Sequence, residues 1–379
     1  MIYLDNAATS WPKPPSVQEA MSRFLEEGAG SPNRSGHRMA AAAERIVMDV
    51  RTKLAKLFGV KDPLRIVFTF NCTDALNMAL KGALREGDHV VTTQLDHNSI
   101  LRPLRAMAEA GRITMTMLPL TADGCADPDA FREAVTPETR MFATLHASNV
   151  TGIIQPIGEI GRIAREVGCL LLVDAAQSAG LVNIDVQAMN IDLLAFPGHK
   201  SLYGPTGTGG LYVGERAELN PWREGGTGGD SIHPTQPEEF PTWLEAGTPN
   251  VVGLAGLNAA LEELDPARNL MLVGRLAKRF IGNIEQDERF RLVGLSRGEV
   301  GVGVVSLVAL GTTPEEVAAI LDESFGIAVR PGLHCAPFVH RSLGTFPDGT
   351  IRVAPGPSTT KKDIDKLLSA IREIVAQLV

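Results

Sequence analysis

The sequence predicts an α/β protein with a large, mostly parallel sheet covered by helices on both faces and a small α+β domain after it. Strand-like apolar runs alternate with helical stretches in the first half, at residues 65–70, 89–94, 113–120, 141–146, 169–175 and 192–196. This alternation is typical of parallel sheets whose crossover connections are helices. A Gly- and Pro-rich stretch at 222–249 then interrupts the pattern and indicates where a second set of elements begins.

The helices of the first half are predicted from apolar spacing and from their starting residues. Between residues 38 and 59 apolar residues recur every three or four positions, which favours one helix that ends near Gly59. Further helical stretches begin near Thr73, Ser99, Pro128 and Pro156. Together with the apolar runs, they complete a repeated strand–helix order.

The second half has the pattern of a smaller α+β unit. A helix over about 250–264 leads into apolar runs at 302–310, 327–330 and 351–354, with helices from Pro314 and from about Lys361. We predict a large domain over residues 14–262 and a small domain that combines residues 1–13 with residues 263–379. Because no flexible linker separates the two, we expect them to pack around a shared cleft.

Composition excludes several classes of function. The 379 residues are 44% hydrophobic and 21% charged, which is typical of a globular protein and not of a disordered chain. The 36 Lys and Arg residues and 44 Asp and Glu residues give a formal charge of −8, the wrong sign for nucleic acid or an anionic membrane. No apolar run approaches the ~20 residues of a membrane helix, and the N-terminus lacks a signal-peptide pattern. We therefore expect a cytoplasmic protein that binds neither nucleic acid nor a membrane.

The four cysteines are far apart in the sequence. They are Cys72, Cys125, Cys169 and Cys335. Because none belongs to a CxxC pair, their spacing predicts neither a disulfide framework nor a metal site.

Polar residues follow the ends of the predicted strands, where parallel sheets bind their ligands. After 65–70 the chain enters NCTDAL, where a helix N-terminus and the Thr73 hydroxyl suit a phosphate, although a simple helix cap gives the same pattern. The later runs are followed by His97, Asn149, Asp174 and Gln177. Each of these residues alone is also typical of a turn, a cap or a satisfied surface side chain.

The loop after the run at 192–196 favours a ligand site over these simpler structural roles. It reads PGHKSLYGPTGTGG and holds Lys200 directly after a buried strand. A desolvated lysine has a lowered pKa and can form a Schiff base. A lysine for an aldehyde, a carboxylate such as Asp174 for a pyridinium nitrogen and a helix N-terminus for a phosphate are what pyridoxal 5′-phosphate (PLP) requires. We therefore predict PLP as the cofactor, with His97 able to stack on its ring and move protons.

Taken in order, the motifs resemble a known family. LDNAAT, NCTDAL, DH, SNVTG, VDAAQS, GHK, EAGTPN and RPGLHCAP extend over nearly the whole chain. The sequence is thereby similar to the cysteine desulfurase branch of the class V aminotransferases, which are fold-type I PLP enzymes. GHK with VDAAQ is specific to the superfamily, while HCAP points to the desulfurases and the related selenocysteine lyases. The resemblance implies a seven-stranded, mostly parallel sheet in the large domain.

The resemblance also implies roles in cofactor binding. Lys200 would form the Schiff base, Asp174 would pair with the pyridinium nitrogen, and His97 would stack on the ring. Residues implied to lie near the ring or its phosphate are Asn149, Gln177, Thr73, His199 and the backbone around Cys72. Thr248 of EAGTPN would reach the phosphate of the other subunit's cofactor, which predicts a homodimer with active sites at its interface.

Cys335 is implied to be the residue that accepts sulfur. His334 precedes it, Arg330 lies five residues before it, and nearby prolines confine its loop, a setting that stabilises a thiolate. The family role is attack of this thiolate on the sulfur of PLP-bound cysteine, which leaves a persulfide on the enzyme and releases alanine. The substrate is therefore expected to be L-cysteine or selenocysteine, and a sulfur-acceptor protein is a candidate partner.

Four residues are expected near the substrate. Arg352 in TIRVAP matches the family's carboxylate-binding arginine, whose planar fork suits a bidentate contact. Arg330 is a second candidate for the same region. Arg34 and His37 in NRSGH partly match the substrate-side segment of the family and are placed near the cleft.

Two positions depart from the family pattern. Asn71-Cys72 stands where many relatives have Gly-Thr, and Pro197 precedes GHK where a phosphate-binding hydroxyl is common, so two expected hydroxyl donors are missing.

Two other functions stay open. Within PLP chemistry, the alternative is a selenocysteine lyase or another class V lyase or aminotransferase in which Cys335 is incidental. From a different class, a Rossmann-like phosphate- or nucleotide-binding module explains the strand–helix order but gives no role to Lys200 and Cys335.

Overall fold

The computed structural model describes residues 1–379 except 29, 33–35, 230–231, 233, 295–299 and 379. Its largest element is a seven-stranded sheet in the order β2-β8-β7-β6-β5-β3-β4. The strands are β2 (Ile66–Thr69), β3 (His89–Thr93), β4 (Thr114–Leu118), β5 (Thr139–Leu145), β6 (Leu170–Asp174), β7 (Leu193–Pro197) and β8 (Gly209–Val213). Within this sheet β8 pairs antiparallel with both of its neighbours and the other pairs are parallel. The predicted mostly parallel sheet is confirmed.

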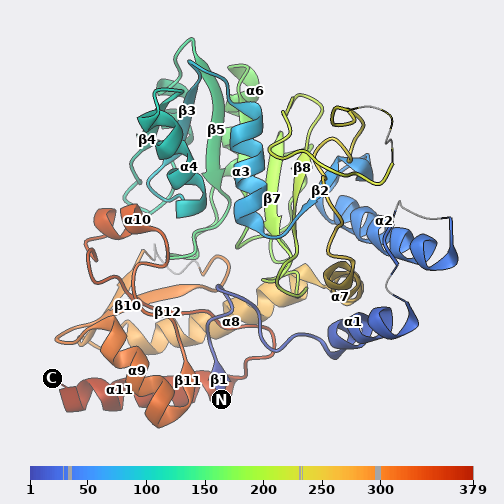
Figure 1. The fold of residues 1–379 in the computed structure, drawn as a ribbon. Coiled ribbons are helices and arrows are strands. Elements are labelled where there is room, and N and C mark those ends of the chain that lie inside the picture. The colour runs from blue at the N-terminus through green and yellow to red at the C-terminus, as the bar shows by residue number, and fades with distance from the viewer. Residues whose placement is uncertain (29, 33–35, 230–231, 233, 295–299, 379) are drawn as a thin grey trace.

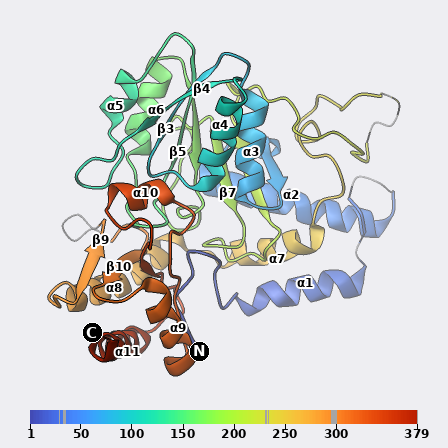
Figure 2. The same cartoon turned by 60° about the vertical axis from the view of Figure 1, so that its left-hand side comes forward.

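Helices cover both faces of the large sheet, as Figures 1 and 2 show. Successive strand residues point to opposite faces, so Val91 packs in the apolar cluster of α2, α6 and α7. Val90 packs in the cluster of α3 and α4 on the other face. The helices of this part are α1 (Pro15–Glu27), α2 (Arg38–Phe58), η1 (Pro63–Arg65), α3 (Cys72–Ala83), α4 (Asn98–Glu109), α5 (Pro128–Glu133), α6 (Ile157–Glu166) and α7 (Val251–Glu262).

The C-terminal part forms a second, smaller unit around an antiparallel sheet of order β12-β10-β9. Apolar side chains of α8, α9 and α11 pack against this sheet. The N-terminal strand β1 (Ile2–Tyr3) pairs in parallel with β11 (Ile327–Ala328), so the start of the chain joins the C-terminal elements. The other elements are α8 (Pro266–Ile284), β9 (Phe290–Val293), β10 (Val305–Ala309), α9 (Pro314–Phe325), α10 (Pro337–Ser342), β12 (Ile351–Val353) and α11 (Lys361–Leu378).

Two helix starts face the smaller unit and position the site described below (Figure 1). The first, of α3, is fixed by Asn71, whose Oδ1 accepts the Asp74 N–H at 2.9 Å. At the second, of α4, His97 is the capping residue and its Nδ1 accepts the Ser99 N–H at 3.1 Å. In the described part of the chain, none of the helices has both the length and the apolar character that crossing a membrane requires.

Candidate active site

Most of the predicted cofactor-site residues line one pocket at an edge of the large sheet. They are Cys72, Thr73, His97, Asn149, Asp174, Gln177, His199 and Lys200. The strand order explains their convergence: β5, β6 and β7 are neighbours, and the residues that follow parallel strands meet at the same edge. The starts of α3 and α4 close the pocket from the side.

Asp174 and Lys200 form the charged centre of this pocket. Asp174 ends β6 and is 4% exposed, and its Oδ1 accepts hydrogen bonds from the Ala176 N–H (2.8 Å) and the Cys72 thiol (3.4 Å). Within the described residues its other oxygen, Oδ2, accepts no hydrogen bond. Burial lowers the pKa of Lys200, and the nearby Asp174 carboxylate opposes this shift. The lysine therefore gives up its proton more easily than an exposed lysine does.

His97 is oriented by a serine that sequence reasoning treated only as a helix start. Ser99 Oγ lies 2.9 Å from His97 Nδ1 and 2.8 Å from Thr73 Oγ1, which joins the starts of α3 and α4. Burial lowers the pKa of His97 to about 4, so its ring is neutral at pH 7. Because Nδ1 accepts the Ser99 N–H, the ring proton is on Nε2. The spacing of the Ser99 hydroxyl, two residues after His97, is the feature of the sequence that could have predicted this contact.

The N-terminal segment clamps the loop that carries Lys200. The His199 carbonyl accepts hydrogen bonds from Lys13 Nζ (2.7 Å), the Ser10 N–H (3.1 Å) and Thr9 Oγ1 (3.1 Å). Ser10 Oγ also donates to the Lys200 carbonyl at 2.8 Å. Burial lowers the pKa of Lys13 to about 8. No pattern in the sequence predicts this contact, because nothing local relates the N-terminus to a loop almost two hundred residues later.

The Cys335 loop is fastened to the wall of the same pocket. The Asn98 N–H donates to the Cys335 carbonyl at 2.9 Å, and Asn149 Nδ2 donates to the His334 carbonyl at 2.6 Å. The thiol itself is exposed, with Arg330 Nη2 3.7 Å from its Sγ. His334 and Cys335 have φ values of 48° and 59°, which residues other than glycine rarely adopt. Contacts with the large sheet thus hold the cysteine in an unusual backbone conformation beside the pocket.

Arg352 lies at the boundary between this loop and the large sheet. It is 1% exposed, pairs through Nη2 with Asp5 Oδ1 at 2.6 Å and donates from Nη1 to the Asn149 carbonyl at 3.2 Å. Its Nε is buried and has no hydrogen-bond partner among the described residues. Backbone hydrogen bonds join Arg352 to Arg330, so the two predicted substrate arginines are neighbours.

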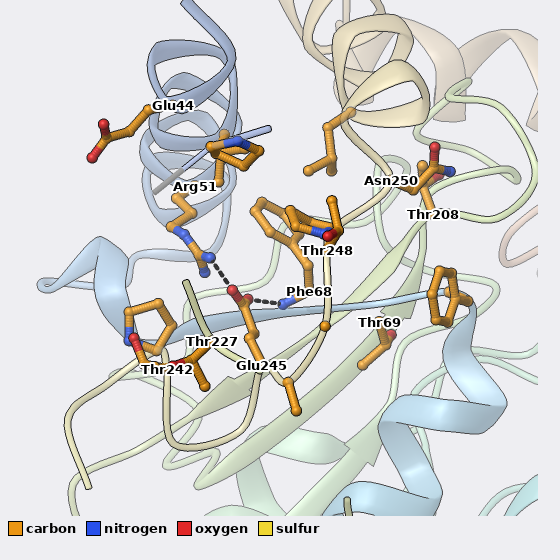
Figure 3. A pocket seen from close by; sticks show the side chains of 18 of the residues that line it. Glu44, Arg51, Phe68, Thr69, Thr208, Thr227, Thr242, Glu245, Thr248 and Asn250 are labelled. Atoms are coloured by element: carbon orange, nitrogen blue, oxygen red, sulfur yellow. Dashed lines mark hydrogen bonds and ion pairs between the residues drawn. The ribbon is translucent and has the colours of Figure 1, made fainter. Parts of the chain in front are cut away.

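Two other predicted residues, His37 and Thr248, do not line the pocket of Lys200. His37 is an exposed cap of α2 whose Nδ1 accepts the Ala40 N–H at 3.2 Å, and Arg34 lies outside the described residues. Thr248 lines a different pocket, shown in Figure 3. There Arg51 pairs with Glu245, whose second oxygen accepts the Phe68 N–H at 2.6 Å. This buried ion pair fixes the segment that leads to Thr248.

The fold and this pocket together define a class of protein. The model of the aminotransferase class-V family matches residues 2–367, so the chain belongs to this family. The family resemblance seen in the motifs is confirmed. Similar proteins are a probable cysteine desulfurase of Methanothermobacter thermautotrophicus, 33% identical over 98% of this chain and 94% of the relative, and the cysteine desulfurase CsdA of Escherichia coli, 34% identical over 100% and 95%.

Solved structures of cysteine desulfurases are also similar to this chain over its whole length. The apo structure of a cysteine desulfurase from Thermococcus onnurineus superposes with a TM-score of 0.92 at 33% identity, covering 100% of this chain and 95% of that one. A structure of CsdA from Escherichia coli gives a TM-score of 0.87 at 32% identity, with the same coverage. The predicted fold class is thereby confirmed over the whole chain.

Proposed function

We propose that this protein is a PLP-dependent cysteine desulfurase that converts L-cysteine to L-alanine and keeps the sulfur as a persulfide on Cys335. One observation carries the proposal: the exposed Cys335 thiol stands beside Arg330 on a loop fastened to the pocket of Lys200 and Asp174. An aminotransferase or a simple lyase has no use for a thiol in this position. Full-length similarity to cysteine desulfurases supports the same reaction.

The residues present fit PLP as the cofactor. Lys200 is an amine whose pKa is lowered by desolvation and which suits the aldehyde. Asp174 Oδ2 accepts no hydrogen bond within the described residues and is left for the pyridinium nitrogen. Asn149 Oδ1 is a buried acceptor without a partner among the described residues and lines the same pocket. The start of α3 at Cys72 and Thr73 offers free N–H groups to the phosphate. Gln177 and His199 complete the proposed cofactor site.

The chain's own groups then supply binding and proton transfer. Bound PLP supplies an electron sink for the electron pair released at the substrate Cα. Asp174 keeps the ring nitrogen protonated, and Lys200 Nζ, whose pKa burial lowers, takes the proton from Cα. His97, neutral and protonated on Nε2, would pack against the ring of bound PLP and would have its Nε2–H available as a donor. Arg352 and Arg330 bind the substrate carboxylate, with the unpartnered Nε of Arg352 as one donor.

Sulfur transfer uses Cys335 as nucleophile. Its thiolate attacks the substrate sulfur, so a bond from Cys335 Sγ to that sulfur forms and the substrate Cβ–S bond breaks. The electron pair of the broken bond stays with the substrate Cβ, which takes up a proton, and Lys200 Nζ returns the proton to Cα to give alanine. Arg330, 3.7 Å from Sγ, places positive charge beside the thiolate.

The active unit is proposed to be a homodimer. Thr248 belongs to the family motif EAGTPN, yet it does not line the pocket of Lys200 in its own chain. A second copy that places its Thr248 at the phosphate explains both facts. Size-exclusion chromatography with light scattering tests this, and a monomer that keeps full activity would contradict it.

The proposed reaction is tested with purified protein and L-cysteine. We expect a yellow protein that releases alanine and forms a persulfide on Cys335, detected by mass spectrometry, with selenocysteine assayed as the alternative substrate. Cys335→Ser is expected to keep the colour and lose sulfur transfer, because a hydroxyl is a poor soft nucleophile at neutral pH. The matched control for Cys335→Ser is Cys125→Ser. Lys200→Ala should lose both colour and turnover. Alanine and sulfide released by Cys335→Ser at the wild-type rate would overturn the proposal.

A further inference from the structure

Five arginine side chains belong to elements next to the Cys335 loop. We call Arg102, Arg105, Arg291, Arg330 and Arg341 the arginine patch. Arg102 and Arg105 are exposed on α4, whose neighbouring element α10 carries Arg341 (Figures 1 and 2). Arg291 donates to the carbonyls of Leu343 and Gly344 after α10, and Arg330 touches the thiol. The patch therefore extends from the reacting sulfur over the surface of two helices.

Aromatic rings hold two of these arginines in place. The Arg105 guanidinium lies 4.6 Å from the centre of the Phe338 ring, and Arg341 lies 5.7 Å from the same ring. Arg341 also lies 4.4 Å from the centre of the Phe346 ring, which is 45% exposed. Stacking on an aromatic face leaves the N–H groups of an arginine free to bind a carboxylate. Both guanidinium groups are thus presented to solvent in a fixed orientation.

The patch has no carboxylate partners in the described part of the chain. None of its arginines takes part in an ion pair there, although other arginines of the protein do. Glu109 at the end of α4 and Asp348 after Phe346 are exposed but pair with none of them. In a chain with a formal charge of −8, this local excess of positive charge is unusual. Such a surface attracts an anionic partner and accelerates its encounter.

We propose that the arginine patch is the docking surface for a sulfur-acceptor protein whose reactive thiol lies in an acidic surface. The inference rests on the proposed function, because it requires a persulfide on Cys335. That cysteine is exposed, which a transfer of its sulfur to a group outside the protein requires. Carboxylates around the partner's thiol would pair with Arg105 and Arg341 and set the thiol against Cys335.

The transfer that follows docking is balanced without an oxidant or reductant. The partner's thiolate attacks the terminal sulfur of the Cys335 persulfide, and a new S–S bond forms on the partner. The bond between that sulfur and Cys335 Sγ breaks, and Cys335 leaves as a thiolate. The proton of the original persulfide stays with the transferred sulfur, and the enzyme is ready for another substrate.

The inference is tested with two synthetic peptides that differ only in the residues around one cysteine, aspartate and glutamate in one and lysine in the other. Each is mixed with wild-type holoenzyme carrying the Cys335 persulfide, and transfer is followed by mass spectrometry. We expect the acidic peptide to react at least about tenfold faster at low salt and to lose this advantage at high salt. The double variant R105E/R341E should abolish the preference or reverse it.

Control measurements separate docking from chemistry. R105E/R341E is expected to form the Cys335 persulfide and to release sulfide to dithiothreitol at the wild-type rate, because neither residue contacts the pocket. Arg275→Glu on α8, also exposed and without an ion pair among the residues that the structure describes, should keep the acidic preference. If R105E/R341E still preferred the acidic peptide, the inference would be overturned and the proposed function would stand. The same holds if wild-type enzyme showed no preference for the acidic peptide while an oligonucleotide competed with both peptides. Absence of any persulfide in wild-type protein would overturn the proposed function as well.

Discussion

At the residue scale, Cys72 shows how one substitution changes the surroundings of the cofactor site. The sequence suggested that a hydroxyl donor to the phosphate is missing at this position, and in the structure the thiol donates to Asp174 Oδ1 at 3.4 Å. Together with the Ala176 N–H, this contact occupies one carboxylate oxygen and leaves Oδ2 for the pyridinium nitrogen. Cys72 therefore orients the carboxylate, while the helix N-terminus remains available to the phosphate.

The role of Cys72 leads to a prediction about PLP retention. Cys72→Ala removes the hydrogen bond and lets Asp174 rotate, so PLP should dissociate several-fold faster during dialysis. Cys72→Ser keeps a donor, and a hydroxyl is a better donor than a thiol, so PLP should be retained at least as well as in the wild type. A hydrogen bond to a charged group contributes about 1.5–3 kcal/mol at most. Equal PLP loss from the alanine variant, the serine variant and the wild type would show that the contact is irrelevant.

At the element scale, the N-terminal segment is a structural part of the active site. It pairs with β11 through β1 and holds the Lys200 loop through the carbonyls of His199 and Lys200. It also supplies the Ala7 carbonyl, which accepts from Gln177 Nε2 at 3.0 Å. A segment that is early in the sequence thus joins both units at the pocket.

Within this segment, Lys13 is the side chain whose replacement we expect to change stability and PLP retention most clearly. Lys13→Met keeps most of the volume but removes the donor to the His199 carbonyl and to Ser10 Oγ. We expect a loss of about 1.5–3 kcal/mol of stability and faster PLP loss, because the Lys200 loop is held less tightly. The matched control is Lys61→Met, an exposed lysine between α2 and η1. Urea unfolding and dialysis of both variants measure the two effects, and identical behaviour would contradict the clamp.

At the scale of the whole molecule, five histidines with lowered pKa values destabilise the folded chain on acidification, while burial raises the pKa of Asp96 to about 7, which offsets the effect of one histidine over the same pH range. Burial lowers the pKa of His97, His146, His199 and His340 to about 4 and that of His334 to about 2. The unfolded chain binds these protons near the ordinary pKa of 6.5, whereas the folded chain does not. The stability they contribute is therefore complete above about pH 6.5 and is lost as the pH falls toward 4.

We accordingly expect the unfolding free energy to fall steeply on acidification. Each of these histidines contributes a slope of about 1.4 kcal/mol per pH unit between roughly pH 6 and 4. Urea unfolding at several pH values between 7.5 and 5 measures the slope. His146→Gln, outside the proposed catalytic groups, should reduce the slope by one proton. A denaturation midpoint that does not change over this range would refute the expectation.

Much of the architecture is encoded locally and was therefore predictable. Apolar runs and helix signals predicted the parallel order of the large sheet, because burial on both faces requires continuous apolar strands. Polar residues at strand ends, among them Asp174 and Lys200, could be placed in one site because parallel strands end at one edge. The local setting of Cys335, with His334, Arg330 and nearby prolines, distinguished it from the other cysteines, and the family motifs added its role as sulfur acceptor.

The sequence by itself thus determined the fold class, the family and the residue types at the centre of the site. Only the tertiary structure decided where side chains from distant segments meet. It directed the Cys72 thiol to Asp174, joined Ser99 to His97 and Thr73, and stacked Arg105 of α4 on Phe338 of α10. The physical reason is that periodicity and turn signals act over a few residues, whereas these contacts depend on how whole elements pack against one another.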